Sequence, residues 1–423
     1  MRRRPGTACT SAIALAVALV ACGQAEPDPV DELAPVEPTP VVETDPEPEL
    51  ERAQAIPEET AAMLEAIGYV DRAATDNPDV RGVTENEGAS RGLNLFSSRD
   101  RAIAHLTDLE GEVVHTWQTS GAGRAWMHIE PLPDGSVLAI TKDRDVARHA
   151  WDSSLIWRTP VRAHHDLAVR GDGSLLVLTR RPDQIELNGT TTPVLTDDIV
   201  ELSADGERGA VHPLLPLFQD DLSSYRRGRI AALFESGGRA QVLRAGGVGD
   251  VLHTNSIAIL DHDLDGVAPA GSLLLSFRAT SRIAIVDAAV ERVLWSWGRG
   301  ELQGQHDATQ LDNGNILLFD NGNRRNASRA LEVDPRTDEI VWRYEAEDLY
   351  SMLRGGAQRL DNGNVLITEA DAGHALEVTR EGTRVWEFWN PDVRPREGGG
   401  SERAVLYRLN RFPRTLFAPL AAE

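Results

Sequence analysis

Three histidines occupy equivalent points of three successive sequence units, where their side chains could act together. Counting back eight residues from the turn glycines Gly173 and Gly314 leads to His165 and His306, and His253 begins the matching strand of the unit between them. Neutral imidazole is a nucleophile and a base near pH 7, and it also binds divalent metals. Three imidazoles at one register therefore predict either group transfer coupled to proton transfer, or a metal site.

A second register, seven residues after each turn glycine, is rich in cations. Guanidinium groups hold sulfate or phosphate through paired hydrogen bonds, and cations that converge in an acidic protein concentrate a positive field. We therefore predict a small-anion site at a rim facing channel water, with Arg180, Lys142 and Asn321 in contact with the substrate. The register reads Arg99, Lys142, Arg180, Arg278, Asn321 and Ala370.

Four other histidines are interpreted as lying outside the site, three of them as structural. His115, His128 and His374 each stand alone at or near a strand start, with no partner at the same register. His164 precedes His165, and the alternation of side chains along a strand directs it away from the channel.

The elements that must position these side chains are six copies of one unit. Each copy has a glycine turn followed by an apolar strand, and then a hairpin whose outer strand usually ends in tryptophan. Asn-Gly and Asp-Gly supply the positive φ angles of tight hairpins, and the apolar runs fit strands packed on both faces. The turn glycines are Gly92, Gly135, Gly173, Gly271, Gly314 and Gly363.

Six such units predict an all-β fold, a six-bladed β-propeller with four-stranded blades around a channel. The third and fourth turns are unusually far apart, so residues 184–249 are interpreted as an insertion from the third blade. Residues 404–409 have the composition of a strand that could close the ring against the first blade. The propeller is expected to span residues 81–415 as the catalytic domain.

The N-terminal segment has the features of an export signal. Three arginines precede a short apolar run that ends in Leu-Val-Ala-Cys22, which resembles the lipobox of bacterial lipoproteins. We expect a signal peptide over residues 1–21, lipidation at Cys22, a disordered Pro/Glu-rich tether over 22–60 and a short helical lead-in over 61–80. The protein would then be exported and lipid-anchored to the bacterial envelope, at the outer membrane.

Charge and cysteine content narrow the class of protein. The chain has 66 acidic and 43 basic residues and a net charge of −23, which excludes nucleic acid as a partner. Its two cysteines, Cys9 and Cys22, would leave with the signal peptide or carry lipid, so the mature domain has no disulfide. No phosphate-binding glycine loop is present, so no nucleotide is implied and no cofactor is expected.

The blocks that carry these residues resemble the bacterial arylsulfate sulfotransferase family, over about residues 82–408. The resemblance implies a six-bladed propeller that moves a sulfuryl group from a phenyl sulfate to a phenol through a sulfohistidine, without PAPS. Small phenolic sulfates and phenols would be its partners, with the membrane reached through the lipid anchor and a homodimer left open. The matching blocks are Gly111–Trp117, His164–Leu167, His253–Ser256, Ser276–Arg278 and Gly304–Gly314.

The resemblance also implies a role for each site residue. A histidine of the family's Gln-His-Asp block accepts the sulfuryl group, which corresponds to His306. The family's His-x-Asn pair and an arginine on the next strand hold the sulfuryl oxygens. These residues correspond to His253, Asn255 and Arg278. An earlier histidine completes the cluster, and His165 is our candidate for moving the proton between the phenols.

Two other classes of function stay open. The three channel histidines could bind zinc or another divalent metal and carry out hydrolysis or lyase chemistry, whereas the sulfotransferase needs no metal. A non-catalytic propeller that binds a ligand such as a carbohydrate is the third interpretation. Metal analysis would separate the first class from the sulfotransferase, and turnover of an aryl sulfate would separate the third.

Overall fold

The computed structural model describes residues 72–98, 101–119, 125–187, 189–222, 227, 230, 232 and 249–421. The expected signal peptide, Cys22, the tether, Arg99 and residues 61–71 of the expected helical lead-in lie outside these ranges. Within the described ranges, no helix is long and apolar enough to cross a membrane.

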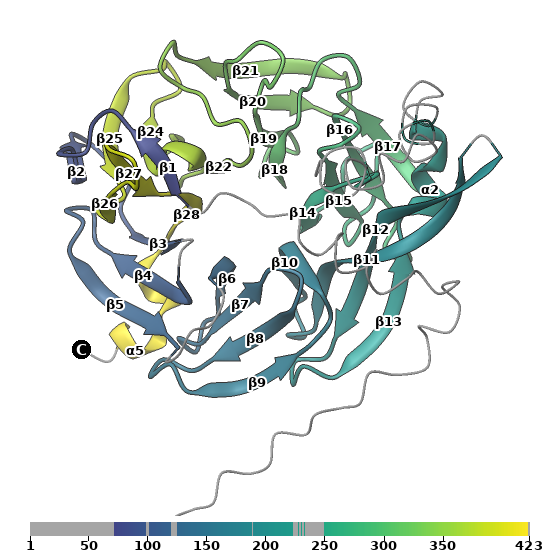
Figure 1. The fold of residues 1–423 in the computed structure, drawn as a ribbon, viewed down its shortest axis with the longest axis horizontal. Coiled ribbons are helices and arrows are strands. Elements are labelled where there is room, and N and C mark those ends of the chain that lie inside the picture. The colour runs from purple at the N-terminus through teal and green to yellow at the C-terminus, as the bar shows by residue number, and fades with distance from the viewer. Residues whose placement is uncertain are drawn as a thin grey trace, which may run out of the picture. The chain divides into compact units, whose positions relative to one another are not determined.

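Six antiparallel sheets surround a central axis, each with one strand nearest that axis (Figure 1). Five of these sheets have four strands and one has five, which confirms the six-bladed β-propeller. From the axis outward, blade one consists of β28 (Leu406–Phe412), β3 (Leu93–Ser98), β4 (Ile103–Thr107) and β5 (Val113–Gln118). Blade two consists of β6 (Trp126–Pro131), β7 (Val137–Thr141), β8 (Asp145–His149) and β9 (Leu155–Thr159). Blade three consists of β10 (Ala163–Val169), β11 (Leu175–Leu187), β12 (Thr190–Leu202) and β13 (Arg208–Pro213).

The remaining three blades follow the same order around the ring. Blade four consists of β14 (Thr254–Ile259), β15 (Leu273–Phe277), β16 (Arg282–Val286) and β17 (Val293–Trp297). Blade five consists of β18 (His306–Gln310), β19 (Ile316–Asp320), β20 (Arg329–Asp334) and β21 (Glu339–Glu345). Blade six consists of β22 (Gly356–Arg359), β23 (Val365–Glu369), β24 (His374–Val378), β25 (Arg384–Trp389) and β2 (Gly82–Asn86). Short helical segments are α2 (Leu215–Phe218), η2 (Gln219–Asp221), η3 (Ala370–Ala372), η4 (Arg414–Leu416) and α5 (Ala418–Ala421).

Strands from both ends of the described chain close the ring. β28 is the inner strand of blade one and pairs with β3, with Leu406 opposite Ser98, so the expected closing strand is confirmed. β2 pairs with β25 and adds a fifth, outer strand to blade six. Because β28 pairs with β3, blade one has a complete four-stranded sheet, although β28 is far in sequence from the other three strands.

A separate three-stranded sheet joins β1 (Arg72–Thr75), β27 (Ser401–Ala404) and β26 (Val393–Pro395). The expected helical lead-in over 61–80 is therefore wrong for residues 72–75. They are extended because they pair with β27, and the guanidinium of Arg72 bonds the carboxylate of Asp392 at 2.5 Å. Neither partner is near these residues in the sequence.

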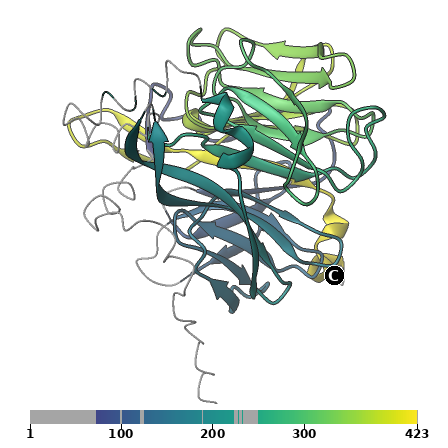
Figure 2. The same ribbon diagram turned by 90° about the vertical axis from the view of Figure 1, so that its right-hand side faces the viewer.

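Blade three is enlarged in a way that corrects the expected insertion. β11 and β12 are 13 residues long each, and their paired ends extend beyond the neighbouring strands (Figure 1, Figure 2). Residues 190–202 and 208–213, assigned to the insertion over 184–249, are instead the third and fourth strands of the blade. The extra length is thus divided between a longer hairpin and the segment after β13.

The hydrophobic core lies between adjacent blades. Between blades four and five, for example, Leu274, Ile285, Leu318 and Leu331 are completely buried in one cluster. All side chains of β15 and β19 are buried, because each of these strands packs on both faces. This packing holds the inner strands, and hence the site, in place.

The tryptophans of the outer strands link successive blades. In four blades one such tryptophan donates its indole N–H to a carbonyl in a turn of the next blade, because a buried or partly buried indole needs a partner. In blade one, His115 makes the corresponding bond, with Nε2 at 2.7 Å from the carbonyl oxygen of Trp151. The tryptophan bonds are Trp157–Ala204, Trp297–Asp338, Trp342–Arg380 and Trp386–Leu109.

Candidate active site

The three histidines at one register lie together at the inner strands of blades three, four and five. His165 belongs to β10, His253 directly precedes β14, and His306 opens β18. The Nε2 atoms of His165 and His253 are 3.0 Å apart, and the ring centroids of His165 and His306 are 6.3 Å apart. The strand starts converge because every inner strand approaches the same axis.

The cluster is buried, which corrects the expectation that these positions face channel water. His165, His253 and His306 are 1%, 3% and 1% exposed, respectively. The reason is tertiary: side chains of β28, among them Tyr407 and Arg408, fill the space beside the histidines from the opposite side of the ring.

The pairing of each of the three inner strands is irregular at its histidine or directly after it. The register shifts between Ala163 and Leu167, between Thr254 and Ser256, and between His306 and Thr309. His165 and His253 adopt φ angles of 61° and 52°, in the left-handed region that residues other than glycine seldom occupy. A bulge re-aims a side chain, and backbone strain of this kind concentrates at functional sites.

His306 is held in a single tautomer. Its Nδ1 atom lies 2.7 Å from Oδ1 of Asn321 and 3.1 Å from the carbonyl oxygen of Gly304, and both are acceptors. Nδ1 therefore carries the proton, and Nε2 bears the lone pair. Burial and the nearby charge of Arg278 lower the pKa of His306 well below its ordinary value, so the ring stays neutral. Nε2 is buried and has no hydrogen-bond partner among the described residues.

The other two histidines belong to a chain of polar contacts. An oxygen of Asp250 lies 2.7 Å from Nδ1 of His253, and Nε2 of His253 faces Nε2 of His165. Nδ1 of His165 is in turn 2.8 Å from the hydroxyl of Tyr407. Because both ring nitrogens of each histidine face a partner, a proton can be passed between the two imidazoles and the phenol, with the carboxylate stabilising positive charge on His253.

Protonation along this chain is set by burial and charge. Burial, reinforced by His253, lowers the pKa of His165 well below its ordinary value. Burial also lowers the pKa of His253, although Asp250 opposes the shift. Despite its burial, Asp250 has a pKa below the ordinary range because His253 and Arg180 stabilise its charge. The pair of imidazoles is thus neutral at rest and able to accept a proton.

Arg278 is a cation whose charge acts on two of the site histidines. It follows β15, its backbone N–H donates to the carbonyl of His253 at 3.0 Å, and its charge lowers the pKa of both His253 and His306. Its side chain is half-buried and, within the described ranges, has no carboxylate partner. An unpaired guanidinium beside a nucleophile can hold the oxygens of an anionic substrate.

The expected substrate contacts of Arg180 and Lys142 are not supported by their surroundings. Arg180 is buried and bonds Asp143 at 2.6 and 2.7 Å and Asp250 at 3.0 Å. The ammonium of Lys142 lies 3.5 Å from Asp143. Arg180 is neutralised by carboxylates from blade two and from the segment before blade four, whereas Lys142 lies beside the carboxylate of the next residue in its own turn. Both charges are thus already balanced within the protein.

The two asparagines also have different roles from those expected. The amide nitrogen of Asn321 donates to the carbonyls of Ser351 and Arg354 at 2.7 and 2.8 Å, so its oxygen must face His306. The amide nitrogen of Asn255 donates at 2.8 Å to the carbonyl of Gln305, the residue before His306. Asn321 thus positions the nucleophile directly. Asn255 holds the backbone beside it through its nitrogen, and its Oδ1 is buried with no hydrogen-bond partner among the described residues.

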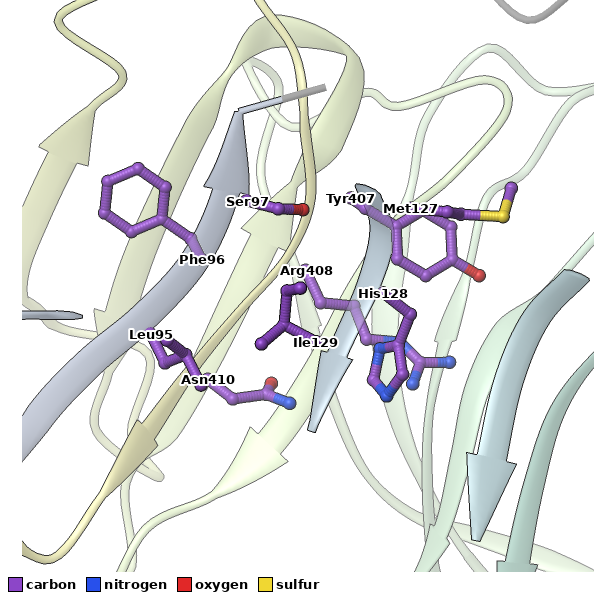
Figure 3. Close-up of a pocket in the computed structure, with 9 residues that line it drawn as sticks. All are labelled: Leu95, Phe96, Ser97, Met127, His128, Ile129, Tyr407, Arg408 and Asn410. Carbon is purple, nitrogen blue, oxygen red and sulfur yellow. The ribbon is translucent and has the colours of Figure 1, made fainter. Parts of the chain in front are cut away.

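Several polar residues of the site escaped prediction. Asp166 and Asp307 each follow a site histidine, and Arg408 and Tyr407 come from the closing strand. The repeated His-Asp pair was a readable signal for the aspartates, whereas nothing local marks the two residues of β28. His128, expected to be structural, lies 3.4 Å from Asp166 and lines a narrow cavity with Arg408 and Tyr407 (Figure 3).

The orientation of the imidazoles bears on the metal interpretation. The Nε2 atoms of His165 and His253 face each other at hydrogen-bond distance, so they are not directed at one common point. Within the described ranges, no group of three or more histidine, cysteine, aspartate or glutamate side chains is arranged to hold a metal ion.

Comparisons with known proteins give one family. The profile of the family described as Arylsulfotransferase (ASST) matches residues 128–391, a range that contains the three site histidines and Arg278. No curated protein matches the chain.

Solved structures resemble the chain at low sequence identity. A protein of unknown function from Bacteroides caccae is 15% identical, with 71% of this chain and 94% of that chain covered and a TM-score of 0.48. A streptogramin B lyase is 13% identical, with 81% of this chain and 98% of that chain covered and a TM-score of 0.45. Apo AztD from Citrobacter koseri is 10% identical, with 71% of this chain and 96% of that chain covered and a TM-score of 0.40.

Proposed function

Because the chain belongs to the arylsulfotransferase family, we propose that it moves a sulfuryl group from an aryl sulfate ester to a phenol through a sulfohistidine at His306, without PAPS. The observation that supports this most directly is the state of His306. Its Nδ1 proton is bonded to Asn321, which leaves a neutral ring with a buried, unbonded lone pair on Nε2. A neutral imidazole in this tautomer is a ready nucleophile.

In the first half-reaction Nε2 of His306 attacks the sulfur of the donor. The N–S bond forms as the S–O bond to the aryl group breaks, and a phenolate leaves. Nδ1–H remains bonded to Asn321, which stabilises the positive charge that the ring acquires. Arg278 stabilises the negative charge on the three sulfuryl oxygens, as a preorganised cation does in other group transfers.

The second half-reaction reverses these steps with a new phenol. The incoming phenol gives its proton to the imidazole pair of His165 and His253, and its oxygen attacks the sulfur. The N–S bond breaks and His306 regains its lone pair. The pair then releases this proton to water, and the departed phenolate takes up one proton from water, so the exchange balances and the pair and Tyr407 return to their starting state.

The geometry favours this function over the alternatives. His165 and His253 face each other at hydrogen-bond distance, an arrangement that suits proton transfer between them, and Nε2 of His306 keeps a lone pair that can attack an electrophile. A non-catalytic binding site gives no reason to hold one histidine as a neutral nucleophile beside an unpaired guanidinium.

The test combines kinetics with a covalent label. Purified protein is incubated with para-nitrophenyl sulfate and a second phenol, and nitrophenolate release is followed by absorbance. After donor alone, mass spectrometry should find one added sulfuryl group on the peptide that contains His306. Ping-pong kinetics are expected, because the sulfuryl-enzyme persists until a phenol arrives.

The matched variants are His306→Ala and His374→Gln, since both residues are buried histidines. His306→Ala should abolish both label and turnover, and it should also lower the unfolding free energy by about 1–3 kcal/mol because a buried ring is removed. His374→Gln should keep the label, since His374 bonds Glu369 outside the cluster. A label on another residue, or turnover in His306→Ala, would contradict the mechanism.

A further inference from the structure

The dipeptide His-Asp occurs on two inner strands, as His165–Asp166 in β10 and His306–Asp307 in β18. In both copies the histidine belongs to the site and the aspartate is buried. The two aspartates come from blades three and five, and both bond Arg408 of the closing strand β28. Arg408 lies outside the range that the family profile matches.

Arg408 uses three nitrogen atoms on these two carboxylates. Nη1 and Nη2 donate to the two oxygens of Asp166 at 3.0 and 3.2 Å, and Nε lies 3.2 Å from an oxygen of Asp307. A planar guanidinium matches a carboxylate in this paired way, whereas an ammonium acts as a point charge. Although burial disfavours its charge, Asp166 and Asp307 hold the pKa of Arg408 above its ordinary value.

The same group of contacts reaches every blade. Arg408 belongs to the sheet of blade one, the aspartates to blades three and five, and His128 of blade two lies 3.4 Å from Asp166. Blade four adds the backbone N–H of Ile257, bonded to Asp166 at 3.1 Å, and blade six adds the N–H of Ala357, bonded to Asp307 at 3.0 Å. A displacement of Arg408 would therefore disturb a set of contacts to which all six blades contribute.

The backbone at both dipeptides requires such an anchor. His165 has a φ angle of 61° and Asp307 a φ angle of 58°, and each lies in the β-bulge of its strand. Conformations of this kind persist only where surrounding contacts fix them. Because each aspartate is covalently next to its histidine, a carboxylate fixed by Arg408 also fixes the direction of the imidazole.

We infer that Arg408 is a positioning residue for sulfuryl transfer, which sets the separation of His165 and His306 by binding the aspartate beside each. Closure of the ring by β28 thereby completes the active site. The role in transfer rests on the proposed function, whereas the role in placing the two imidazoles does not.

The test compares Arg408 with Arg411, another buried arginine of β28, which bonds Glu377 instead of the His-Asp pairs. Arg408→Lys should lower the rate of His306 sulfation by about 100-fold with little change in KM, since a small misplacement of reacting groups has that effect. Arg411→Lys should leave the rate within about twofold of wild type. Equal rates in the two variants would overturn the inference.

Chemical rescue separates positioning from general damage. Guanidinium ion added to Arg408→Ala should restore a measurable part of the rate, because the ion can occupy the vacated site between Asp166 and Asp307. The same ion should not change the rate of Arg411→Ala. If Arg408→Ala does not fold, the triple variant Asp166→Asn, Asp307→Asn, Arg408→Met removes the buried charges together, and it should fold yet transfer slowly. Wild-type rates in that variant would contradict the inference.

A spectroscopic readout keeps this test apart from that of the proposed function. NMR of histidine labelled in its ring nitrogens reports the hydrogen bond between His165 and His253 and the tautomer of His306 without any substrate. Arg408→Lys should shift both sets of signals, and Arg411→Lys should shift neither. If wild-type protein forms no sulfohistidine, the proposed function fails, but unchanged histidine spectra in Arg408→Lys are what would overturn the placing role.

Discussion

Asp250 holds Nδ1 of His253 at 2.7 Å with the same carboxylate oxygen that accepts a hydrogen bond from Arg180 at 3.0 Å. This arrangement fixes the protonated nitrogen of His253 and turns its other nitrogen toward His165. Arg180, which the sequence suggested as a substrate contact, therefore acts on the site through a carboxylate. Its positive charge is used to keep Asp250 ionised inside the protein.

Replacing Asp250 by asparagine should impair proton transfer more than sulfuryl transfer. The variant loses the charge that stabilises a protonated His253, so the imidazole pair becomes a weaker base. Turnover of phenyl sulfate should fall by about 100-fold or more, the usual scale for general acid–base catalysis, while nitrophenolate release after donor alone should change much less. Equal losses in both measurements would argue against a proton role for the pair.

Substitutions of Asn321 should alter the state of His306. Asn321→Leu removes the acceptor that fixes the Nδ1–H tautomer, and we expect sulfation of His306 to slow by at least about tenfold. Asn321→Asp supplies an acceptor with negative charge, which raises the pKa of His306, so activity should be lost at a higher pH than in wild type. The pH dependence of kcat/KM for the three proteins checks both expectations.

The two arginines should differ in what they support. Arg278→Lys keeps a charge but loses the planar fork, and transfer should be weaker by about 2–4 kcal/mol, the scale of one preorganised oxyanion contact. Arg180→Met should instead reduce the free energy of unfolding by about 3–5 kcal/mol, because the carboxylates of Asp143 and Asp250 would lose the guanidinium that bonds both and would keep only Lys142 and His253 beside them. Kinetics and denaturant titration of both variants give the comparison. A kinetic defect in Arg180→Met without lost stability would reverse the assignment.

The pH dependence should reflect the lowered pKa values of the cluster. Burial lowers the pKa of His165, His253 and His306, so the rings remain neutral as the pH falls below about 6.5, the ordinary value for histidine. The acid limb of kcat/KM for para-nitrophenyl sulfate should therefore lie below that pH. Protons bind these rings more readily in the unfolded chain than in the folded one. The contribution of the rings to the free energy of unfolding is therefore fully present above about pH 6.5 and decreases below it. An acid limb above neutral pH would contradict this.

We propose that the mature protein is attached to the bacterial envelope, at the outer membrane, through a lipid on Cys22. The support is the short apolar run that ends in Leu-Val-Ala-Cys22. Expressed with its own N-terminal segment, the protein should partition into detergent, and Cys22→Ala should move it to the aqueous phase. Equal partitioning of the two forms would contradict the proposal.

The repeat pattern made the fold and the histidine register predictable. Glycine turns and apolar strands are local features, and each recurs six times, so the number of blades followed from the sequence. Counting from a turn placed His165 and His306 at one register, and the longer hairpin of blade four added His253, because a hairpin fixes which residues lie opposite each other. The closing strand was also found, since its composition is that of a strand.

Roles at the site were harder to predict where they depended on partners. Lys142 and Arg180 have the residue type of an anion site, but carboxylates neutralise both in the folded chain. Asn321 occupies the expected register, yet the two carbonyls that bind its nitrogen turn its oxygen toward His306. A sequence position specifies a side chain, whereas its function here depends on which groups other blades bring to it.

The sequence by itself determined six units, their strands and the three histidines that share a register, because these follow from local turn chemistry and from alternation along a strand. Only the tertiary structure decided that the histidines are buried, that bulges direct them inward, and that Tyr407 and Arg408 join them from the other end of the chain. The physical reason is closure of the ring. It brings inner strands of all six blades to one axis, where charge and hydrogen bonding are set by groups that are hundreds of residues apart, such as His165 and Tyr407, separated by 242 positions.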